Sequence, residues 1–318
     1  MKLLTEIPLI SQPHYQIDYD SNILLFGSCF SENIGKKLVY FKFQNYQNPF
    51  GILFHPKAIE TLITYSINQK EYSEADIFYN NEQWHCFDTH SKLSNNSKED
   101  LLIDLNSQLK STNKQIHDAT HIIITLGTAW VYRFIEINSI VANCHKVSQK
   151  QFKKELLSVD DVTQSLNTII SLIKRVNEKA SIVFTVSPVK HLKDGFVENT
   201  LSKSHLITAI HHVLSHQTQS RCFYFPSYEI MMDELRDYRF YAEDMVHPNQ
   251  SAIHYIWERF VKVWISQQSL KTMNVIDFIQ KGILHKPFNP KSEAHLNFLQ
   301  QLETKKNQIQ KEFPEIIF

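Results

Sequence analysis

The sequence predicts a three-layer α/β fold with a mainly parallel central sheet. Four short apolar runs have the composition of strands that are covered on both faces, and segments with helical spacing of apolar residues lie between them. Such alternation of strands and helices is typical of a parallel sheet with helices on both sides. With 318 residues, 42% of them apolar, the chain can bury one large core.

Each element is assigned from its local pattern. The predicted strands are Asn22–Gly27, His121–Gly127, Ser181–Val186 and Cys222–Phe225. The predicted helices are Ser31–Phe43, Lys57–Ile67, Ser97–Lys110, Asp160–Val176, Glu198–Leu214 and Ala252–Ile265. We expect Ser97 to cap its helix and Pro248 to take the first position of the last one. Ile77–Phe87 and Val131–Ala142 are expected to be hairpins that line a cleft, turning at Asn80–Asn81 and near Asn138.

The pattern changes near the end of the chain. Val275–Ile283 reads as a short helix, Pro287 and Pro290 interrupt the chain, and Glu293–Phe313 is a long amphipathic segment. We therefore expect a main domain over residues 1–267 and a C-terminal helical extension over residues 268–318 that packs on it. A contact between copies of the chain is the alternative, and the oligomeric state is left open.

The composition of the sequence limits the binding partners and the cellular compartment that we expect for the protein. Lys plus Arg and Asp plus Glu are both 33, so the charge gives no argument for binding nucleic acid or an anionic membrane surface. The four cysteines are scattered without a CxxC pair, which predicts free thiols. The first residues lack the continuous apolar region of a signal peptide, and no stretch is long enough to span a bilayer. We expect a cytoplasmic protein.

Two polar motifs at predicted strand ends indicate nucleophilic catalysis. The first strand ends in Gly27-Ser28, where a tight turn exposes the hydroxyl at the start of a helix. Taken alone, such a serine is more often a helix cap. Late in the chain, Asp244 and His247 are three residues apart before Pro248, a spacing that lets both side chains face one cleft. A histidine is the usual base for a serine, and a carboxylate fixes its tautomer.

A third motif, Asn48-Pro49-Phe50-Gly51, follows the first helix. Gly51 has no side chain to keep its backbone N–H away from a substrate oxygen. The alternative is an ordinary turn glycine.

The motifs in order resemble the GSCFA family, which is similar to SGNH/GDSL-like hydrolases. They are G-S-C-F-S, N-P-F-G-I, L-G-T-A-W-V-Y, A-N-C-H-K, S-P-V-K-H and D-M-V-H-P, and they extend over roughly residues 20 to 260. The resemblance implies a flavodoxin-like α/β/α fold with a Ser28, Asp244 and His247 triad. It also implies that the amides of Ser28 and Gly51 form part of the oxyanion hole.

One departure from the SGNH pattern concerns the oxyanion hole. SGNH enzymes usually supply an Asn side chain from a G-x-N-D motif, but here the central strand ends in Gly127-Thr128-Ala129-Trp130. Loss of such a donor typically raises the barrier by about 3–4 kcal/mol, so we expect a replacement. Asn143 is the favoured donor, and Thr128 is the alternative. Cleft contacts with substrate are expected from Thr128, Trp130, His145 and His191.

These observations lead to a serine-dependent esterase for acyl or acetyl esters, with O-acylated carbohydrate as one substrate class, and with no cofactor or metal. Two alternatives stay open. One is a ligand-binding module that keeps the fold without catalysis, because the G-x-N-D motif is missing. The other is a metal-dependent hydrolase that uses His85, His90, Cys144 or His145, although no pair has a recognised ligand spacing.

Overall fold

The computed structural model describes residues 5–216 and 221–318. Its centre is a five-stranded parallel sheet with the strand order β10-β9-β5-β1-β2. The bounds are β1 Ile23–Gly27, β2 Asn45–Gln47, β5 His121–Leu126, β9 Ser181–Val186 and β10 Cys222–Tyr224. Counted along the chain, this is the flavodoxin-like order 2-1-3-4-5. The predicted α/β class and all four predicted strands are confirmed.

The edge strand β2 escaped the sequence analysis. Its residues, Asn45, Tyr46 and Gln47, are half-buried and mostly polar, so they lack the apolar run that marks the central strands. The strand forms because its backbone pairs in parallel with Ile23, Leu24 and Leu25 of β1.

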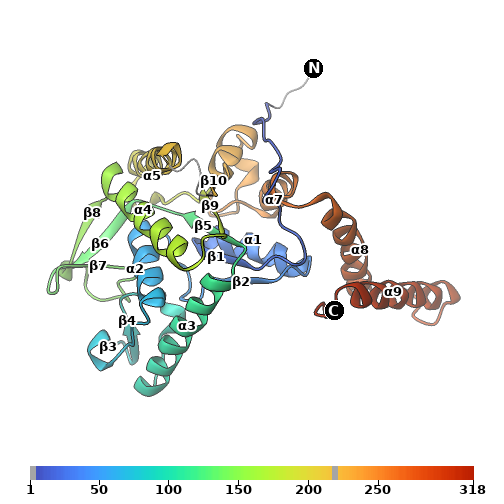
Figure 1. Ribbon diagram of the computed structural model, residues 1–318, viewed down its shortest axis with the longest axis horizontal. Helices are drawn as coiled ribbons and strands as arrows, with labels where there is room; N and C mark the ends of the chain where they lie inside the picture. The colour runs from blue at the N-terminus through green and yellow to red at the C-terminus, as the bar shows by residue number, and fades with distance from the viewer. Residues whose placement is uncertain (1–4, 217–220) are drawn as a thin grey trace.

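Helices cover both faces of the sheet (Figure 1). The helices on one face are α2 Pro56–Ile67, α3 Lys98–Asp118, α4 Val159–Val176 and α5 Phe196–His216. Those on the other face are α1 Cys29–Tyr40 and α7 Gln250–Trp264, and α8 Gln267–Leu284 packs outside them. As predicted, Ser97 caps α3, accepting a hydrogen bond from the Asp100 N–H. No helix in the described parts of the chain is long and apolar enough to cross a membrane.

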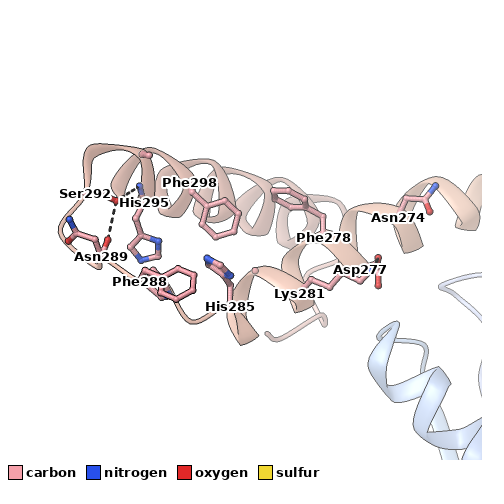
Figure 2. Close-up of a pocket in the computed structure, with 13 residues that line it drawn as sticks. Asn274, Asp277, Phe278, Lys281, His285, Phe288, Asn289, Ser292, His295 and Phe298 are labelled. Carbon is pink, nitrogen blue, oxygen red and sulfur yellow. Dashed lines mark hydrogen bonds and ion pairs between the residues drawn. The ribbon is translucent and has the colours of Figure 1, made fainter.

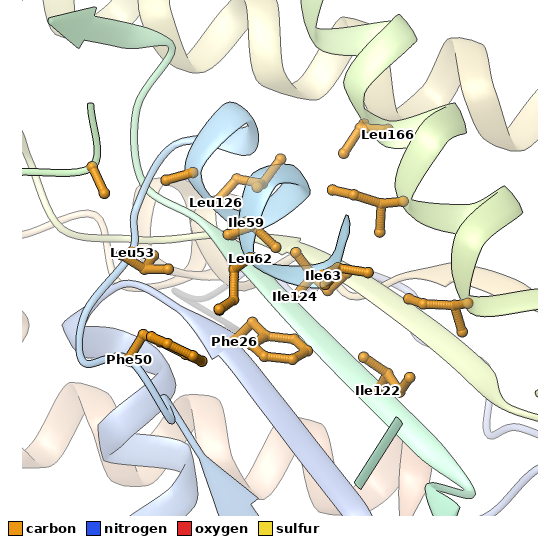
Figure 3. Close-up of a cluster of buried hydrophobic side chains, with 14 of the residues drawn as sticks. Phe26, Phe50, Leu53, Ile59, Leu62, Ile63, Ile122, Ile124, Leu126 and Leu166 are labelled. Carbon is orange, nitrogen blue, oxygen red and sulfur yellow. The ribbon is translucent and has the colours of Figure 1, made fainter. Parts of the chain in front are cut away.

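The two cores receive alternate side chains of the strands. In β1, Leu24 and Phe26 point into the core under α2 to α5, whereas Ile23 and Leu25 point toward α1 and α7. Figure 3 shows Phe26 and Ile124 of the sheet beneath Ile59 and Leu62 of α2. This alternation explains the continuous apolar runs of the sequence, because both faces of each strand are buried.

Two small antiparallel sheets stand beside the main one. The first pairs β3 Ile77–Asn80 with β4 Gln83–Cys86, as expected, but its turn lies at Asn81 and Glu82, which both have positive φ. The second joins β6 Trp130–Phe134 to β7 Ser139–Val141 and also to β8 Phe152–Leu156. Strand β8 was not predicted, because the sequence FKKEL buries only its first residue fully.

Near the C-terminus, two predictions are wrong in detail. Pro248 does not begin α7; it forms an isolated bridge with Tyr241, and Asn249 caps the helix that starts at Gln250. Helix α8 is longer than Val275–Ile283, because Ser266 caps it and Thr272 and Met273 are buried as well. Helix α9, Glu293–Glu312, follows as predicted, whereas the short helix α6, Ser227–Glu229, between β10 and α7 was not predicted.

The C-terminal extension, α8 with α9, packs against α1 (Figure 1). The Tyr40 hydroxyl donates to Asp277 at 2.9 Å, and the Gln280 amide donates to the Tyr40 carbonyl at 3.0 Å. Near the end of the chain, the Phe313 ring lies 5.0 Å from that of Tyr19.

The turn that ends β1 depends on Gly27. Its φ of 136° favours glycine, and a Cβ here would collide with the Thr125 carbonyl oxygen of β5. This close approach of backbone to backbone sets the position of the next residue, Ser28.

We predict that Gly27→Ala lowers the free energy of unfolding by about 3 kcal/mol or more, because it adds a steric clash to backbone strain. Urea unfolding followed by circular dichroism measures the change. The control is Val39→Ala on the exposed side of α1, which should stay within about 0.5 kcal/mol of the wild type. Equal effects of the two substitutions would contradict the assigned role of Gly27.

Candidate active site

Ser28 lies where the sequence placed it, on the turn between β1 and α1. It is the N-cap of α1, with φ −70° and ψ 173°, and its Oγ accepts a hydrogen bond from the Phe30 N–H at 3.3 Å. The residue is only 2% exposed. Ser28 is therefore a helix cap in this structure, and its hydroxyl also stands at the carboxyl edge of the sheet, where open α/β folds bind ligands.

Asp244 and His247 form a hydrogen-bonded pair in the loop before α7. The Asp244 Oδ2 lies 2.7 Å from the His247 Nδ1, and Oδ1 accepts the backbone N–H groups of Val246 and His247 at 2.9 and 3.0 Å. With a carboxylate at Nδ1, that nitrogen carries the proton and Nε2 is left as a base. Both side chains are about half exposed, at 50% and 48%.

The pKa of Asp244 is lowered to about 2. The backbone N–H of His247 is the main cause, followed by the Val246 N–H and the His247 ring. All three favour the ionised carboxylate. Asp244 therefore stays charged and orients the ring over the whole physiological pH range.

The loop of Asp244 and His247 joins the carboxyl edge through the chain that follows β9. The Lys190 N–H donates to the Val246 carbonyl at 3.1 Å. The pKa of the next residue, His191, is lowered to about 3, mainly by burial and then by the charges of Lys203 and His247. The His191 Nε2 lies 3.0 Å from the place that a Cβ on Gly127 would take. No hydrogen bond joins Ser28 to His247 among the described residues.

The amides expected to form the oxyanion hole are both engaged. The Ser28 N–H donates to the Thr125 carbonyl at 3.1 Å, and the Gly51 N–H closes a turn onto the Asn48 carbonyl at 2.8 Å. The prediction that these two amides are oxyanion donors is therefore not met in this conformation. The physical reason is that folding brings a backbone carbonyl up to each N–H group, from Thr125 to that of Ser28 and from Asn48 to that of Gly51.

The side chain of Asn143 has a donor to spare. Its Oδ1 accepts the His145 N–H at 2.8 Å, and no partner of its Nδ2 is found in residues 5–216 and 221–318. Burial raises the pKa of the neighbouring Cys144 thiol, although a hydrogen bond with Gln149 and the charge of Lys193 oppose this shift.

Thr128 is not free to act as the alternative donor. Its hydroxyl lies 2.9 Å from the Ser202 Oγ and accepts the Trp130 N–H at 3.0 Å. Trp130 itself is half-buried, with its indole N–H donating to the Glu198 carbonyl and Lys154 4.8 Å from its ring centroid. The Trp130 side chain therefore lies beside the loop that follows β5, and the Thr128 hydroxyl stabilises that loop through its two hydrogen bonds.

His145 does not line an accessible cleft, contrary to the expectation. It is buried, its Nε2 lies 2.7 Å from the Cys86 carbonyl oxygen, and its ring lies 4.7 Å from that of His85. Burial lowers its pKa to about 4. His85 is bonded through both ring nitrogens, to the Ser94 hydroxyl and the Asn80 carbonyl oxygen. Within the described residues, no three His, Cys, Asp or Glu side chains are grouped to hold a metal ion.

A family model described as the GSCFA family matches residues 22–260, three quarters of the chain. The chain belongs to the GSCFA family. A second model, described as the C-terminal domain of GSCFA domain proteins, matches residues 276–318. The family assignment confirms the resemblance of the six motifs.

Solved structures with a similar fold include two esterases. One is a carbohydrate esterase family 3 protein from Talaromyces cellulolyticus, with 8% identity, a TM-score of 0.37, and coverage of 81% of this chain and 98% of that one. The other is the acetyl xylan esterase Est2A from the rumen bacterium Butyrivibrio proteoclasticus, with 7% identity, a TM-score of 0.38, and coverage of 76% and 63%. No curated protein sequence matches the chain. At this level of similarity, neither structure bears on the chemistry of the GSCFA site.

Three polar residues of α5 were missed in the sequence of this GSCFA protein. Asn199, Ser202 and Lys203 are buried, and they bind the loops that follow β5 and β9. Their spacing of three and four places them on one helical face, the face that continues in Leu206 and Ile210. Polar residues in line with apolar core positions were the available signal.

A hollow of about 810 Å³ lies elsewhere, between α8 and α9 of the C-terminal extension. Figure 2 shows the rings of His285, His295 and Phe298 around it. None of the predicted catalytic residues lines this hollow, so it does not belong to the candidate active site of the family.

We predict that the Asp244 carboxyl titrates with a pKa of about 2, well below its ordinary 3.8. In His247→Ala the pKa should rise but stay below 3.8, because the two backbone N–H bonds remain. An NMR titration of the carboxyl carbon chemical shift, extending below and above both pKa values, gives the midpoint for the wild type and for the variant. A wild-type midpoint near 3.8 would contradict the bonding of the Asp244 and His247 loop.

Proposed function

We propose that this GSCFA-family protein is a serine-dependent ester hydrolase with Ser28 as nucleophile, His247 as base and Asp244 as the group that orients it. The observation that carries the proposal is the 2.7 Å bond between Asp244 and the His247 Nδ1. It leaves Nε2 as the proton acceptor, in a loop that is hydrogen-bonded to the chain after β9, at the same edge of the sheet as Ser28. A carboxylate, an imidazole and a strand-end serine are the components of a triad.

The proposed reaction has two steps. The Ser28 Oγ attacks the ester carbonyl while its proton passes to the His247 Nε2, and the tetrahedral intermediate then expels the alcohol, which takes that proton. Water next attacks the acyl-enzyme, with His247 accepting the water's proton and returning a proton to the Ser28 Oγ. The acid is released and the enzyme is restored.

The negative charge of the intermediate needs donors other than the Ser28 and Gly51 amides. Helix α1 begins at Cys29, so the positive end of its dipole lies next to Ser28. The spare Nδ2 of Asn143 is the side-chain donor that we propose in place of the missing G-x-N-D asparagine.

The substrate class that we propose is an acyl ester of a small molecule or of a carbohydrate. It follows from the SGNH resemblance of the motifs. Ser28 is 2% exposed, so only a small part of the residue is open to a substrate.

A second candidate function is a ligand-binding module without catalysis. It is favoured by the burial of Ser28 and by its hydrogen bond to Phe30 in place of one to His247. The two functions differ in one respect that can be measured directly, which is the reactivity of the Ser28 hydroxyl.

We predict that a fluorophosphonate probe labels Ser28, as mapped by peptide mass spectrometry, and that Ser28→Ala abolishes both labelling and hydrolysis of acetyl esters. The matched control is Ser97→Ala, because Ser97 caps α3 in the same way. Each substitution removes a cap worth about 0.5–2 kcal/mol, but only the first should remove labelling. Ester turnover that persists in a folded Ser28→Ala protein would exclude Ser28 from the reaction.

For Asn143, we predict that Asn143→Ala lowers kcat by about two to three orders of magnitude with little change in KM, because the donor acts in the transition state. Asn143→Asp separates this role from a structural one: it keeps the acceptor for the His145 N–H and removes the donor. Kinetics with an acetyl ester should show both variants to be slow. An active Asn143→Asp enzyme would refute the donor role.

A further inference from the structure

Lys203 lies inside the protein, on the face of α5 that packs against the sheet. It is 1% exposed, and its Nζ donates to the carbonyl oxygens of Gly127 at 2.6 Å and Ser187 at 2.7 Å. These two residues come directly after β5 and β9, which are neighbours in the sheet. One side chain thus joins two strands at the point where they separate.

The two segments of the chain that leave this point carry candidate site residues. From Gly127 the chain continues to Thr128 and Trp130, and from Ser187 it continues to His191. The neighbours of Lys203 on the helix hold the same loops: the Ser202 Oγ accepts the Ala129 N–H at 2.7 Å, and the Asn199 Oδ1 accepts the His191 N–H at 2.8 Å. Helix α5 therefore fixes both loops in place through hydrogen bonds from three of its side chains.

The burial of Lys203 is costly. No carboxylate lies within ion-pair distance of its Nζ in the described parts of the chain. Burial lowers its pKa to about 7, and its charge adds to the burial that lowers the pKa of His191. A leucine or methionine would fill the same core position without this desolvation penalty. The lysine is thus explained by its two hydrogen bonds at the strand ends and not by packing.

We propose that Lys203 is a positioning residue of the candidate active site, which holds the loops of Trp130 and His191 in place through the carbonyl groups of Gly127 and Ser187. This role rests on the proposed hydrolase function. Lys203 acts through these loops and makes no contact with the reacting atoms.

The test compares Lys203→Met with a matched control, Lys174→Met, in the full chain. The Lys174 Nζ also binds two backbone carbonyls, those of Glu178 at 3.0 Å and Ala180 at 2.6 Å, but it does so where β9 begins. Both variants lose the same type of bond. Only Lys203→Met should slow fluorophosphonate labelling of Ser28, by roughly 10²-fold, the effect of a displacement of about 1 Å at a catalytic site.

Hydrogen exchange measured by mass spectrometry provides a readout that does not depend on activity. Lys203→Met should lose protection in residues 127–131 and 187–191 and keep it elsewhere, whereas Lys174→Met should keep protection in both segments. Lys203→Gln, which retains two N–H donors, should recover part of the protection and of the labelling rate. It also takes the place of the Met variant if that variant does not fold.

The outcomes separate the two proposals. If wild-type Ser28 is not labelled, the hydrolase function fails, and hydrogen exchange alone decides whether Lys203 holds the loops. If Ser28 is labelled and the Lys203 variants react at the wild-type rate, the positioning role is overturned. A loss of protection that spreads evenly over the protein would also overturn it, because it would show an ordinary core residue.

Discussion

The backbone contact between β1 and β5 at Gly27 determines where the candidate site lies. The Ser28 N–H donates to the Thr125 carbonyl, so the end of one central strand is fastened to its neighbour. Only glycine allows the chain to turn there, and α1 starts at once with Ser28 as its cap. The nucleophile candidate, the positive end of α1 and the loops after β5 and β9 are thereby gathered at one edge of the sheet.

How much the sequence could predict depended on burial. Strands such as Ile122–Ile124 and Val183–Phe184 are buried on both faces, so their apolar runs identified them. Strands β2 and β8 were missed because pairing of their backbones, which leaves no mark on side-chain type, is what makes them strands. Pro248 fits the first position of a helix by composition, but Asn249 offers a side-chain cap one residue later and begins the helix instead.

In the candidate site, the pairing of two side chains could be predicted from the sequence, but the hydrogen bonds of the backbone amides could not. The three-residue spacing of Asp244 and His247 is visible in the sequence, and it is sufficient for their side chains to form a hydrogen bond. Whether the amides of Ser28 and Gly51 are free depends on carbonyl groups brought up by folding, from Thr125 in one case and from a turn in the other. Lys203 was overlooked for a similar reason, since a lysine in a helix is usually exposed and only the packed structure shows it against two strand ends.

In the proposed reaction, the hydroxyl oxygen of Ser28 would serve as nucleophile, but in the structure it accepts the Phe30 N–H and stabilises the start of α1. A relative that had lost catalysis would still gain from a serine at this position. His247 has no such structural duty, because its half-exposed ring bonds to Asp244 alone among the described residues. For the proposed hydrolase, retention of the histidine across the family is therefore a better mark of activity than retention of the serine.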